Sequence, residues 1–249
     1  MIYVICDEKN INYGREVCEK TGGVMTDKAP CGELYLCVSD KGISLNKDGL
    51  SYMGDFSSEI KRLKHNNLSH EMLIKASKIK ESDERKEKVA LDATAGMGDD
   101  SLLLAAAGFK VYMYEYNPVI FTLLEDTVKR ALNDKYLSEI AGRMHVINGD
   151  STVLMRELDY TPDVVLLDPM FPERKKSGMI KKKFQLLQCL ESPCSVEAEM
   201  MESGFATGAK RIIVKRPSNG PVLSERKPDY QILGNSIRYD CYNNYLQSK

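Results

Sequence analysis

Tryptophan is absent from this chain of 249 residues, and histidine occurs only three times. Long apolar runs are missing as well, because no stretch approaches the roughly 20 apolar residues that a membrane-spanning helix requires. The first nine residues, M-I-Y-V-I-C-D-E-K, become charged too soon for a signal peptide. We therefore expect a soluble cytoplasmic protein with no membrane partner.

Net charge is scarce too. The 35 Lys and Arg residues and the 36 Asp and Glu residues nearly cancel, so the formal net charge at pH 7 is −1. This excludes a globally basic nucleic-acid-binding protein but permits a local basic patch. The seven cysteines form no Cys-x-x-Cys pair, and the histidines are not spaced as a ligand set with them. We expect reduced thiols and no metal; zinc held through Cys31 and Cys37 is the alternative.

The most informative stretch is residues 89–100, which read V-A-L-D-A-T-A-G-M-G-D-D. Residues 89–91 are typical of a buried strand, and residues 101–107 of a helix that Gly108 ends. Between them, Gly96 and Gly98 allow a tight turn that brings the backbone close to a ligand. This order of strand, glycine loop and helix holds a nucleotide-like ligand in doubly wound α/β folds.

The surroundings of the loop favour one ligand over another. A dinucleotide fingerprint needs a third glycine at position 101, where this chain has Ser101. Asp92, Asp99 and Asp100 would also crowd a pyrophosphate with negative charge. S-adenosylmethionine, with its sulfonium, ammonium and ribose, fits better than NAD. A glycine turn that binds nothing is the structural alternative.

Beyond Gly108, apolar and polar stretches alternate regularly. Strands are expected at 110–116, 143–148, 163–167 and 211–214, and an antiparallel hairpin at 230–242. Helices are expected at 118–136, 151–158 and 197–205. Strands separated by helices imply a mostly parallel sheet with right-handed crossovers.

Four of the expected strands end in an acid: Asp92, Glu115, Asp150 and Asp168. In a parallel sheet these ends share one edge, so the carboxylates line one crevice. Glu115 is placed to accept both ribose hydroxyl hydrogen bonds, and Asp150 with Ser151 to contact an adenine. Each acid taken alone is also typical of a helix cap or a turn.

The fourth of these strands runs into Asp168-Pro169-Met170-Phe171-Pro172. The Asp168 carboxylate suits the N–H bonds of a planar base, Pro169 stiffens the turn, and Phe171 suits stacking on the ring. An aromatic amine is a poor nucleophile, so positioning and electrostatics would lower its barrier to methylation. A proline-rich turn that only ends a strand is the alternative.

The part before the glycine loop divides in two. Residues 1–54 predict a small α+β subdomain, with a hairpin turn at Asp40-Lys41-Gly42. Residues 55–88 predict a charged helical segment and linker, in which Leu68, Met72 and Ala76 share one helical face. Between 59 and 88, nine Lys or Arg residues against six Asp or Glu residues give +3. This indicates either a solvated face or a phosphate-facing surface. Residues 89–249 form the main domain.

Five motifs together resemble the RsmJ-like family of small-subunit ribosomal RNA guanine-N2 methyltransferases: D-A-T-A-G-M-G-D-D, Y-E-Y-N-P, G-D-S, L-D-P-M-F-P and V-K-R-P. The resemblance covers about residues 50–243, and D-P-M-F-P is its most specific element. It implies a Rossmann-like class I methyltransferase fold with a seven-stranded sheet, S-adenosylmethionine as donor, and methylation of one guanine amine in 16S rRNA. Cofactor contacts fall on Asp99-Asp100, Glu115-Tyr116, Asp150-Ser151 and Asp168.

Two positions depart from the family pattern. Family members usually have Arg-Asp after the glycine turn, where this chain has Asp99-Asp100. They also tend to have a glycine-rich run before the fold, where this chain has H-N-N-L-S at 65–69.

A basic segment after the Asp-Pro motif supports an RNA substrate. Six positive charges face one Glu within eleven residues: Arg174, Lys175, Lys176, Lys181, Lys182 and Lys183. Side chains of this kind beside a target pocket suit phosphate contacts to small-subunit rRNA or to an assembling 30S subunit. A solvated loop is the alternative.

Other functions stay open at this point. They are an NAD-dependent oxidoreductase, an RNA-binding module without catalysis, and a methyltransferase of DNA adenine or protein glutamine.

Overall fold

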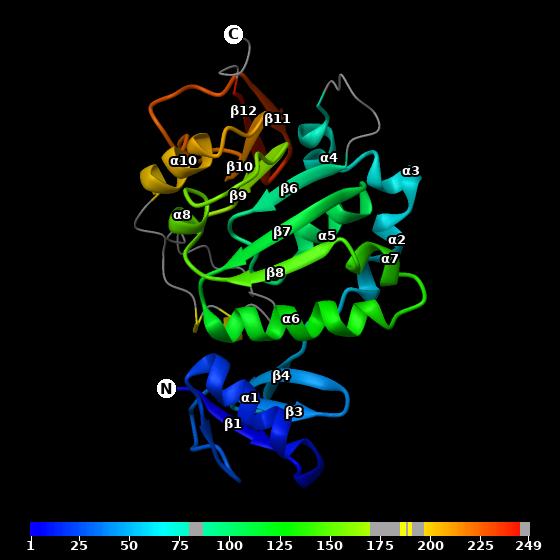
Figure 1. Cartoon of the computed structure of the whole chain (residues 1–249), viewed down its shortest axis with the longest axis vertical. Helices are drawn as coiled ribbons and strands as arrows, with labels where there is room; N and C mark the ends of the chain where they lie inside the picture. The colour runs from blue at the N-terminus through cyan, green and yellow to red at the C-terminus, as the bar shows by residue number, and fades with distance from the viewer. Residues whose placement is uncertain (80–86, 170–184, 188, 191–196, 245–249) are drawn as a thin grey trace.

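The computed structural model describes residues 1–79, 87–169, 185–187, 189–190 and 197–244. Two β-sheets lie on opposite sides of the long helix α6 (Pro118–Leu132) (Figure 1). The larger sheet has seven strands in the order β11-β12-β10-β9-β6-β7-β8. Its strands are β6 (Lys88–Asp92), β7 (Phe109–Glu115), β8 (Met144–Asn148), β9 (Val164–Leu167), β10 (Arg211–Pro217), β11 (Tyr230–Leu233) and β12 (Ile237–Asn243).

The strand order produces a crevice. Strands β8, β7, β6, β9 and β10 run parallel, while β12 runs antiparallel to both of its neighbours, β10 and β11. From β6 the chain winds outward to β7 and β8, and then returns to β9 on the other side of β6. Ligands bind at such a reversal, outside the carboxyl ends of the strands. The predicted fold class is confirmed.

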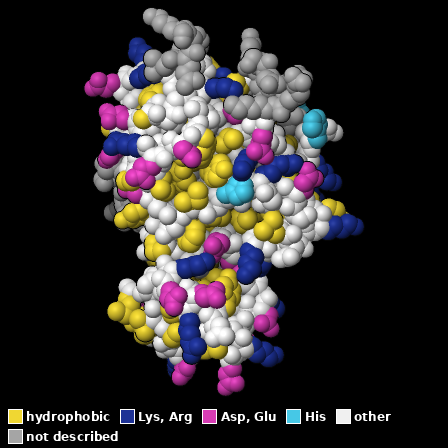
Figure 2. Space-filling model, in the orientation of Figure 1, with side chains coloured by type: hydrophobic (Ala, Val, Ile, Leu, Met, Phe, Trp, Pro, Cys, Tyr) yellow, Lys and Arg dark blue, Asp and Glu magenta, His cyan; other side chains and the backbone are white. Residues whose placement is uncertain are grey.

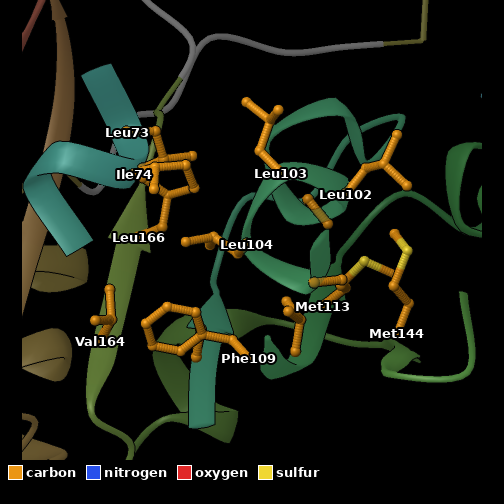
Figure 3. Packing of buried hydrophobic residues seen from close by; sticks show 14 of the residues in the cluster. Leu73, Ile74, Leu102, Leu103, Leu104, Phe109, Met113, Met144, Val164 and Leu166 are labelled. Atoms are coloured by element: carbon orange, nitrogen blue, oxygen red, sulfur yellow. The ribbon is translucent and has the colours of Figure 1, made fainter. Parts of the chain in front are cut away.

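Alternate residues of the central strands enter two hydrophobic cores. Val164 and Leu166 of β9 pack with the leucines of α5 (Asp99–Ala106) and with α4 (Met72–Ser77), as Figure 3 shows. Val165 and Leu167 pack on the opposite face, against α8 (Ser151–Leu154) and α10 (Glu197–Ala206). Because both faces are covered, β9 reads as an unbroken apolar run.

Helix α6 begins as predicted and ends earlier. The Asn117 side chain accepts hydrogen bonds from the N–H groups of Val119 and Ile120, with Pro118 in the first turn. The helix ends at Leu132 rather than near Tyr136. Asp134 accepts the N–H of Tyr136 at 2.7 Å and starts a new turn that leads into α7 (Ser138–Ala141).

Within residues 55–79, the described part of the charged segment, a 3-10 helix (Ser57–Glu59) is followed by three short α-helices rather than by one long one. They are α2 (Ile60–Leu63), α3 (His65–Leu68) and α4. Lys64 and Glu71 adopt extended backbone between them, so Leu68 lies on a different helix from Met72 and Ala76. The expected common face is therefore wrong for Leu68 and correct for Met72 and Ala76, which lie one turn apart on α4. Arg62 of α2 donates hydrogen bonds to both carboxylate oxygens of Glu71, at 2.7 and 2.8 Å, and so ties α2 to the residue that precedes α4.

The smaller sheet has the order β2-β1-β3-β4-β5 and packs through its core on α6. Its strands are β1 (Tyr3–Cys6), β2 (Val24–Met25), β3 (Tyr35–Ser39), β4 (Gly42–Lys47) and β5 (Leu50–Tyr52), and its helix is α1 (Ile11–Thr21). Asp126 of α6 accepts the N–H of Ile43 at 3.1 Å, and Arg130 donates to the carbonyl of Gly54 at 2.5 Å.

The face of the molecule seen in Figure 2 carries acidic and basic side chains interspersed over both units, with an apolar area in the middle of the larger one. Over the ranges that the structure describes, no helix is both long and apolar enough to cross a membrane.

Candidate active site

The parallel strands bring the predicted acids to one edge of the larger sheet. Asp92 ends β6 and Glu115 ends β7, while Asp150 and Asp168 follow β8 and β9. β6 and β9 are direct neighbours, with Asp92 opposite Leu166, so Asp92 and Asp168 lie at the reversal of strand order. The edge is acidic, which suits a ligand that carries positive charge.

The glycine loop has the geometry that its sequence requires. Gly96 and Gly98 have φ angles of 53° and 81°, in the left-handed region that favours glycine. A Cβ atom on Gly98 would lie 2.7 Å from the Leu124 side chain, so this glycine also lets the loop pack on α6. Helix α5 starts immediately afterwards, with Asp99 and Asp100 in its first turn.

Asp92 is buried beneath the loop, with 2% of its surface exposed. It accepts hydrogen bonds from Ser101 Oγ at 2.6 Å and from the Thr94 N–H at 3.1 Å. Burial raises the pKa of Asp92 to about 6. Ser101 occupies the position at which a dinucleotide fingerprint has its third glycine, and its hydroxyl group donates a hydrogen bond to the buried Asp92 carboxylate.

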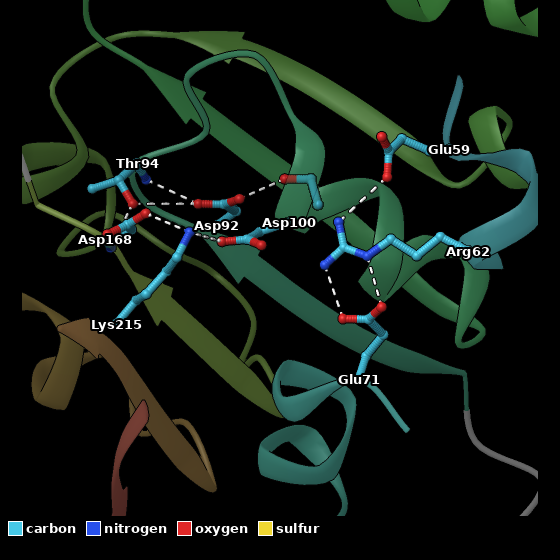
Figure 4. Close-up of polar contacts among 9 residues, drawn as sticks. Glu59, Arg62, Glu71, Asp92, Thr94, Asp100, Asp168 and Lys215 are labelled. Atoms are coloured by element: carbon cyan, nitrogen blue, oxygen red, sulfur yellow. Dashed lines mark hydrogen bonds and ion pairs between the residues drawn. The ribbon is translucent and has the colours of Figure 1, made fainter. Parts of the chain in front are cut away.

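A lysine joins two of the acids at the crevice (Figure 4). Lys215 Nζ, from β10, lies 2.7 Å from Asp100 Oδ2 and 2.9 Å from Asp168 Oδ2. The Asp168 N–H donates to Thr94 Oγ1 at 2.7 Å. Burial is the main cause that raises the pKa of Asp168, and Lys215 opposes it. The Asp168 side chain is still 37% exposed and can be reached from the crevice.

Lys215 and Thr94 were not predicted as site residues. The V-K-R-P motif could have indicated Lys215, because β10 runs parallel to β9 and its carboxyl end lies at the sheet edge that carries the four acids. Thr94 has a weaker signal, as the second residue after β6.

Glu115 connects β7 to the glycine loop. Its Oε2 accepts the N–H of Gly96 at 3.0 Å, and its Oε1 accepts the N–H of Asn117 at 2.8 Å. A carboxylate oxygen has two lone pairs, so it is able to accept more than one hydrogen bond. Tyr116, the next residue, is 75% exposed.

Asp150 and Ser151 begin helix α8. Asp150 Oδ1 accepts hydrogen bonds from the N–H and the hydroxyl of Thr152, at 2.9 and 2.7 Å. Ser151 is buried. Asp150 is therefore a helix cap, and it lies at the same strand edge as the other acids.

Asp99 and Asp100 face different surroundings, although they are adjacent. Asp99 lines a cavity of about 260 Å³ together with Tyr52, Asp55, Glu59 and Met97. Burial, with Asp99 nearby, raises the pKa of Tyr52 to about 12. Of these two residues, Asp100 is the one that forms an ion pair with Lys215, which also pairs with Asp168.

Several predicted residues fall outside the described part of the chain: Phe171, Arg174, Lys175, Lys176, Lys181, Lys182 and Lys183. Pro169 is described and is buried. Within the described ranges, no group of three or more His, Cys, Asp or Glu side chains could hold a metal ion. Cys31 is exposed and Cys37 half-buried, and both are free thiols.

Comparison with known proteins decides the class of chemistry. The model of a family described as putative SAM-dependent methyltransferases matches residues 24–244. The chain belongs to this methyltransferase family. S-adenosylmethionine is therefore its cofactor, as predicted, and the oxidoreductase alternative is not favoured.

Individual relatives agree over most of the chain. A ribosomal RNA small subunit methyltransferase J of Acinetobacter baumannii is 38% identical over 223 residues, which is 84% of this chain and 78% of the relative. The protein of the same name from Acinetobacter baylyi is 39% identical over 84% of this chain and 80% of its own length. The resemblance to the RsmJ-like family is confirmed.

One solved structure resembles this protein over nearly the whole chain. The crystal structure of a SAM-dependent methyltransferase from Neisseria gonorrhoeae has a TM-score of 0.77 and 27% identity to this chain. The match covers 98% of this chain and 96% of that protein.

Proposed function

We propose that this methyltransferase transfers a methyl group to the exocyclic N2 amine of a guanine in small-subunit ribosomal RNA. The observation that carries the proposal is the placement of Asp168. Its half-exposed carboxylate precedes buried Pro169 at the reversal of strand order, beside Asp92. The names of the curated relatives support the same substrate class.

We assign the cofactor to the acidic edge. Glu115 would accept the ribose hydroxyl groups, with Tyr116 beside them, and Asp150 with Ser151 would contact the adenine. Gly96 and Gly98 let the backbone approach. Asp100 and Asp168 would face the cationic end, with Asp92 buried beneath them, whereas Asp99, which was also predicted from the sequence to contact the cofactor, lines the neighbouring cavity. When bound, S-adenosylmethionine supplies an activated methyl group on a positively charged sulfur, which an acidic crevice suits.

Asp168, Pro169 and Phe171 would act on the acceptor. The lone pair of a guanine amine is delocalised into the ring, so the nitrogen attacks well only when it is oriented and in line with the methyl group. The Asp168 carboxylate would accept an amine N–H and receive the proton that the nitrogen releases as the N–C bond forms, while the bond between sulfur and the methyl group breaks and S-adenosylhomocysteine leaves as a neutral thioether. Phe171 would stack on the base.

We assign the basic segment at 174–183 to RNA phosphates, with rRNA or an assembling 30S subunit as the partner. Such contacts fix register on a structured RNA without reading its sequence.

Mass mapping of ribosomal RNA from a strain that lacks the gene tests the proposal. We expect the loss of one N2-methylguanine from small-subunit rRNA. Purified protein with S-adenosylmethionine should restore it in naked RNA, in subunits, or in both, and an Asp168→Asn protein should not. A complete set of rRNA methyl groups, with methylation found on DNA adenine or protein glutamine instead, would overturn the substrate assignment.

A further inference from the structure

Lys215 is a charged residue whose side chain is mostly buried. Strand β10 pairs in parallel with β9, with Val214 opposite Leu167, so Lys215 emerges level with Asp168. Only 23% of its side chain is exposed. Burying an ammonium group is costly unless it is paired, and here both partners are carboxylates within 3 Å.

The two partners belong to different parts of the site. Asp100 lies in the first turn of α5, directly behind the glycine loop, whereas Asp168 begins the motif assigned to the acceptor. Lys215 therefore bridges the cofactor side and the acceptor side of the crevice (Figure 4).

We propose that Lys215 is a positioning residue that fixes Oδ2 of Asp168 and holds this carboxylate in its charged form, so that Oδ1 is presented to the target amine. The part concerning the amine rests on the proposed function, whereas the electrostatic part does not. A carboxylate fixed at one oxygen loses less freedom on meeting the acceptor, and only the charged form can take the proton.

The electrostatic surroundings of Asp168 make this role necessary. The groups that face it are Lys215 and Arg216 of β10, Asp92 of β6, Asp100 of α5 and Tyr239 of β12. Burial raises the pKa of Asp168, Lys215 lowers it most, and Asp100 raises it. Removing Lys215 would leave three acids together in a poorly solvated crevice.

Two substitutions should therefore move the titration of Asp168 in opposite directions. Lys215→Met removes the positive charge and keeps the apolar stem, so the pKa of Asp168 should rise by at least about one, a tenfold change in its protonation equilibrium. Asp100→Asn removes the competing carboxylate, so the pKa of Asp168 should fall. Lys215→Arg keeps the charge and should stay near the wild type.

Carbon-13 NMR of protein labelled at the aspartate carboxyl carbons measures these midpoints without any RNA, and Asp168→Asn assigns the signal. Single-turnover methyl transfer at saturating S-adenosylmethionine then tests the consequence for catalysis. The Lys215→Met deficit should be large at low pH and shrink toward high pH, whereas a purely structural defect would be the same at every pH.

The outcomes separate the two proposals. Unshifted Asp168 midpoints in Lys215→Met and Asp100→Asn overturn the role of Lys215, whatever the substrate is. If Lys215→Met fails to fold in a circular dichroism melt, Lys215→Gln, which also removes the positive charge, takes its place: the Asp168 midpoint should rise, and an unshifted midpoint overturns the role of Lys215. Opposite shifts with no methylation of guanine would uphold the electrostatic role of Lys215 and reject the proposed substrate.

Discussion

Asp92 has a measurable consequence for stability, since it lies buried under the glycine loop with a pKa near 6. Its pKa is raised above the ordinary value of 3.8, so the folded protein binds a proton more tightly than the unfolded chain. The stability that this provides is complete below about pH 4 and is lost as the pH rises through 6.

We therefore expect Asp92→Asn, which does not titrate, to change stability relative to the wild type with pH. A pKa raised from 3.8 to about 6 corresponds to about 3 kcal/mol. Between pH 4 and pH 8 the difference in free energy of unfolding should move by about that amount in favour of the variant. Urea titrations at both pH values measure it, and a pH-independent difference would mean that Asp92 titrates normally.

Glu115 is predicted to hold the ribose. Hydrogen bonds to a charged group contribute roughly 1.5–3 kcal/mol each, so Glu115→Ala should weaken S-adenosylmethionine binding at least about tenfold. Isothermal calorimetry measures this affinity. Glu139→Ala is the matched control, because that side chain is 83% exposed on α7. Equal affinities of wild type and Glu115→Ala would remove Glu115 from the site.

Asp168 is predicted to act on the acceptor rather than on the cofactor. Asp168→Ala should lower turnover at least about a hundredfold, the order expected for a lost positioning and electrostatic contact. Cofactor affinity should fall much less. Methyl-transfer assays and calorimetry on the same protein separate the two effects, and near-normal turnover would contradict the mechanism.

The acids could be predicted because each follows an apolar strand, and parallel strands carry their ends to one edge. The role of Lys215 could not, because its contact with Asp100 spans 115 positions in the sequence. The separation of Asp99 from Asp100 is a matter of helix geometry, since adjacent residues project about 100° apart around an α-helix. Sequence adjacency alone suggested a shared role.

At the scale of elements, long periodic stretches were predicted well. The five parallel strands and the hairpin of β11 and β12 agree closely with expectation. Strands β2 and β5 have only two and three residues, too few to show an alternating pattern. The breaks between α2, α3 and α4 could not be predicted, because the Arg62–Glu71 ion pair that spans them joins residues nine positions apart, a spacing that no helical period indicates. The division at 54/55 and 88/89 stays our proposal.

The glycine loop offers a paired test. Gly98 and Gly108 both have left-handed backbone, so alanine at either costs roughly 1–2 kcal/mol. Nothing lies within 4 Å of a Cβ atom on Gly108, whereas Gly98 would meet buried Leu124. Gly98→Ala should therefore cost roughly 1 kcal/mol or more beyond Gly108→Ala, because overpacking adds to the backbone strain. Thermal melts compare the two, and equal losses would show that Leu124 yields freely.

At the scale of the whole molecule, a net charge of −1 means that RNA binding cannot come from overall charge. The interspersed charges in Figure 2 agree with this. Affinity has to come from a local group of cations, and the segment at 174–183 is the candidate.

Substituting Lys181, Lys182 and Lys183 by alanine should flatten the dependence of log affinity on log salt by roughly 2–3 units, since each phosphate contact accounts for about 0.7–0.9. Cofactor affinity should not change. The control replaces the exposed Lys9, Lys28 and Lys41 of the smaller unit, which removes the same charge. Equal slopes for the wild type and the first variant would place the segment away from the RNA.

Helix α6 serves both units at once. Val119 and Leu123 belong to the core of the smaller sheet, while Leu124 and Val128 belong to that of the larger one. A change of helix tilt that suits one core displaces side chains in the other, because both sets project from the same rigid rod. Substitutions in one core are therefore expected to affect the other through α6, and exchanging the smaller unit between distant relatives would require that α6 be exchanged with it.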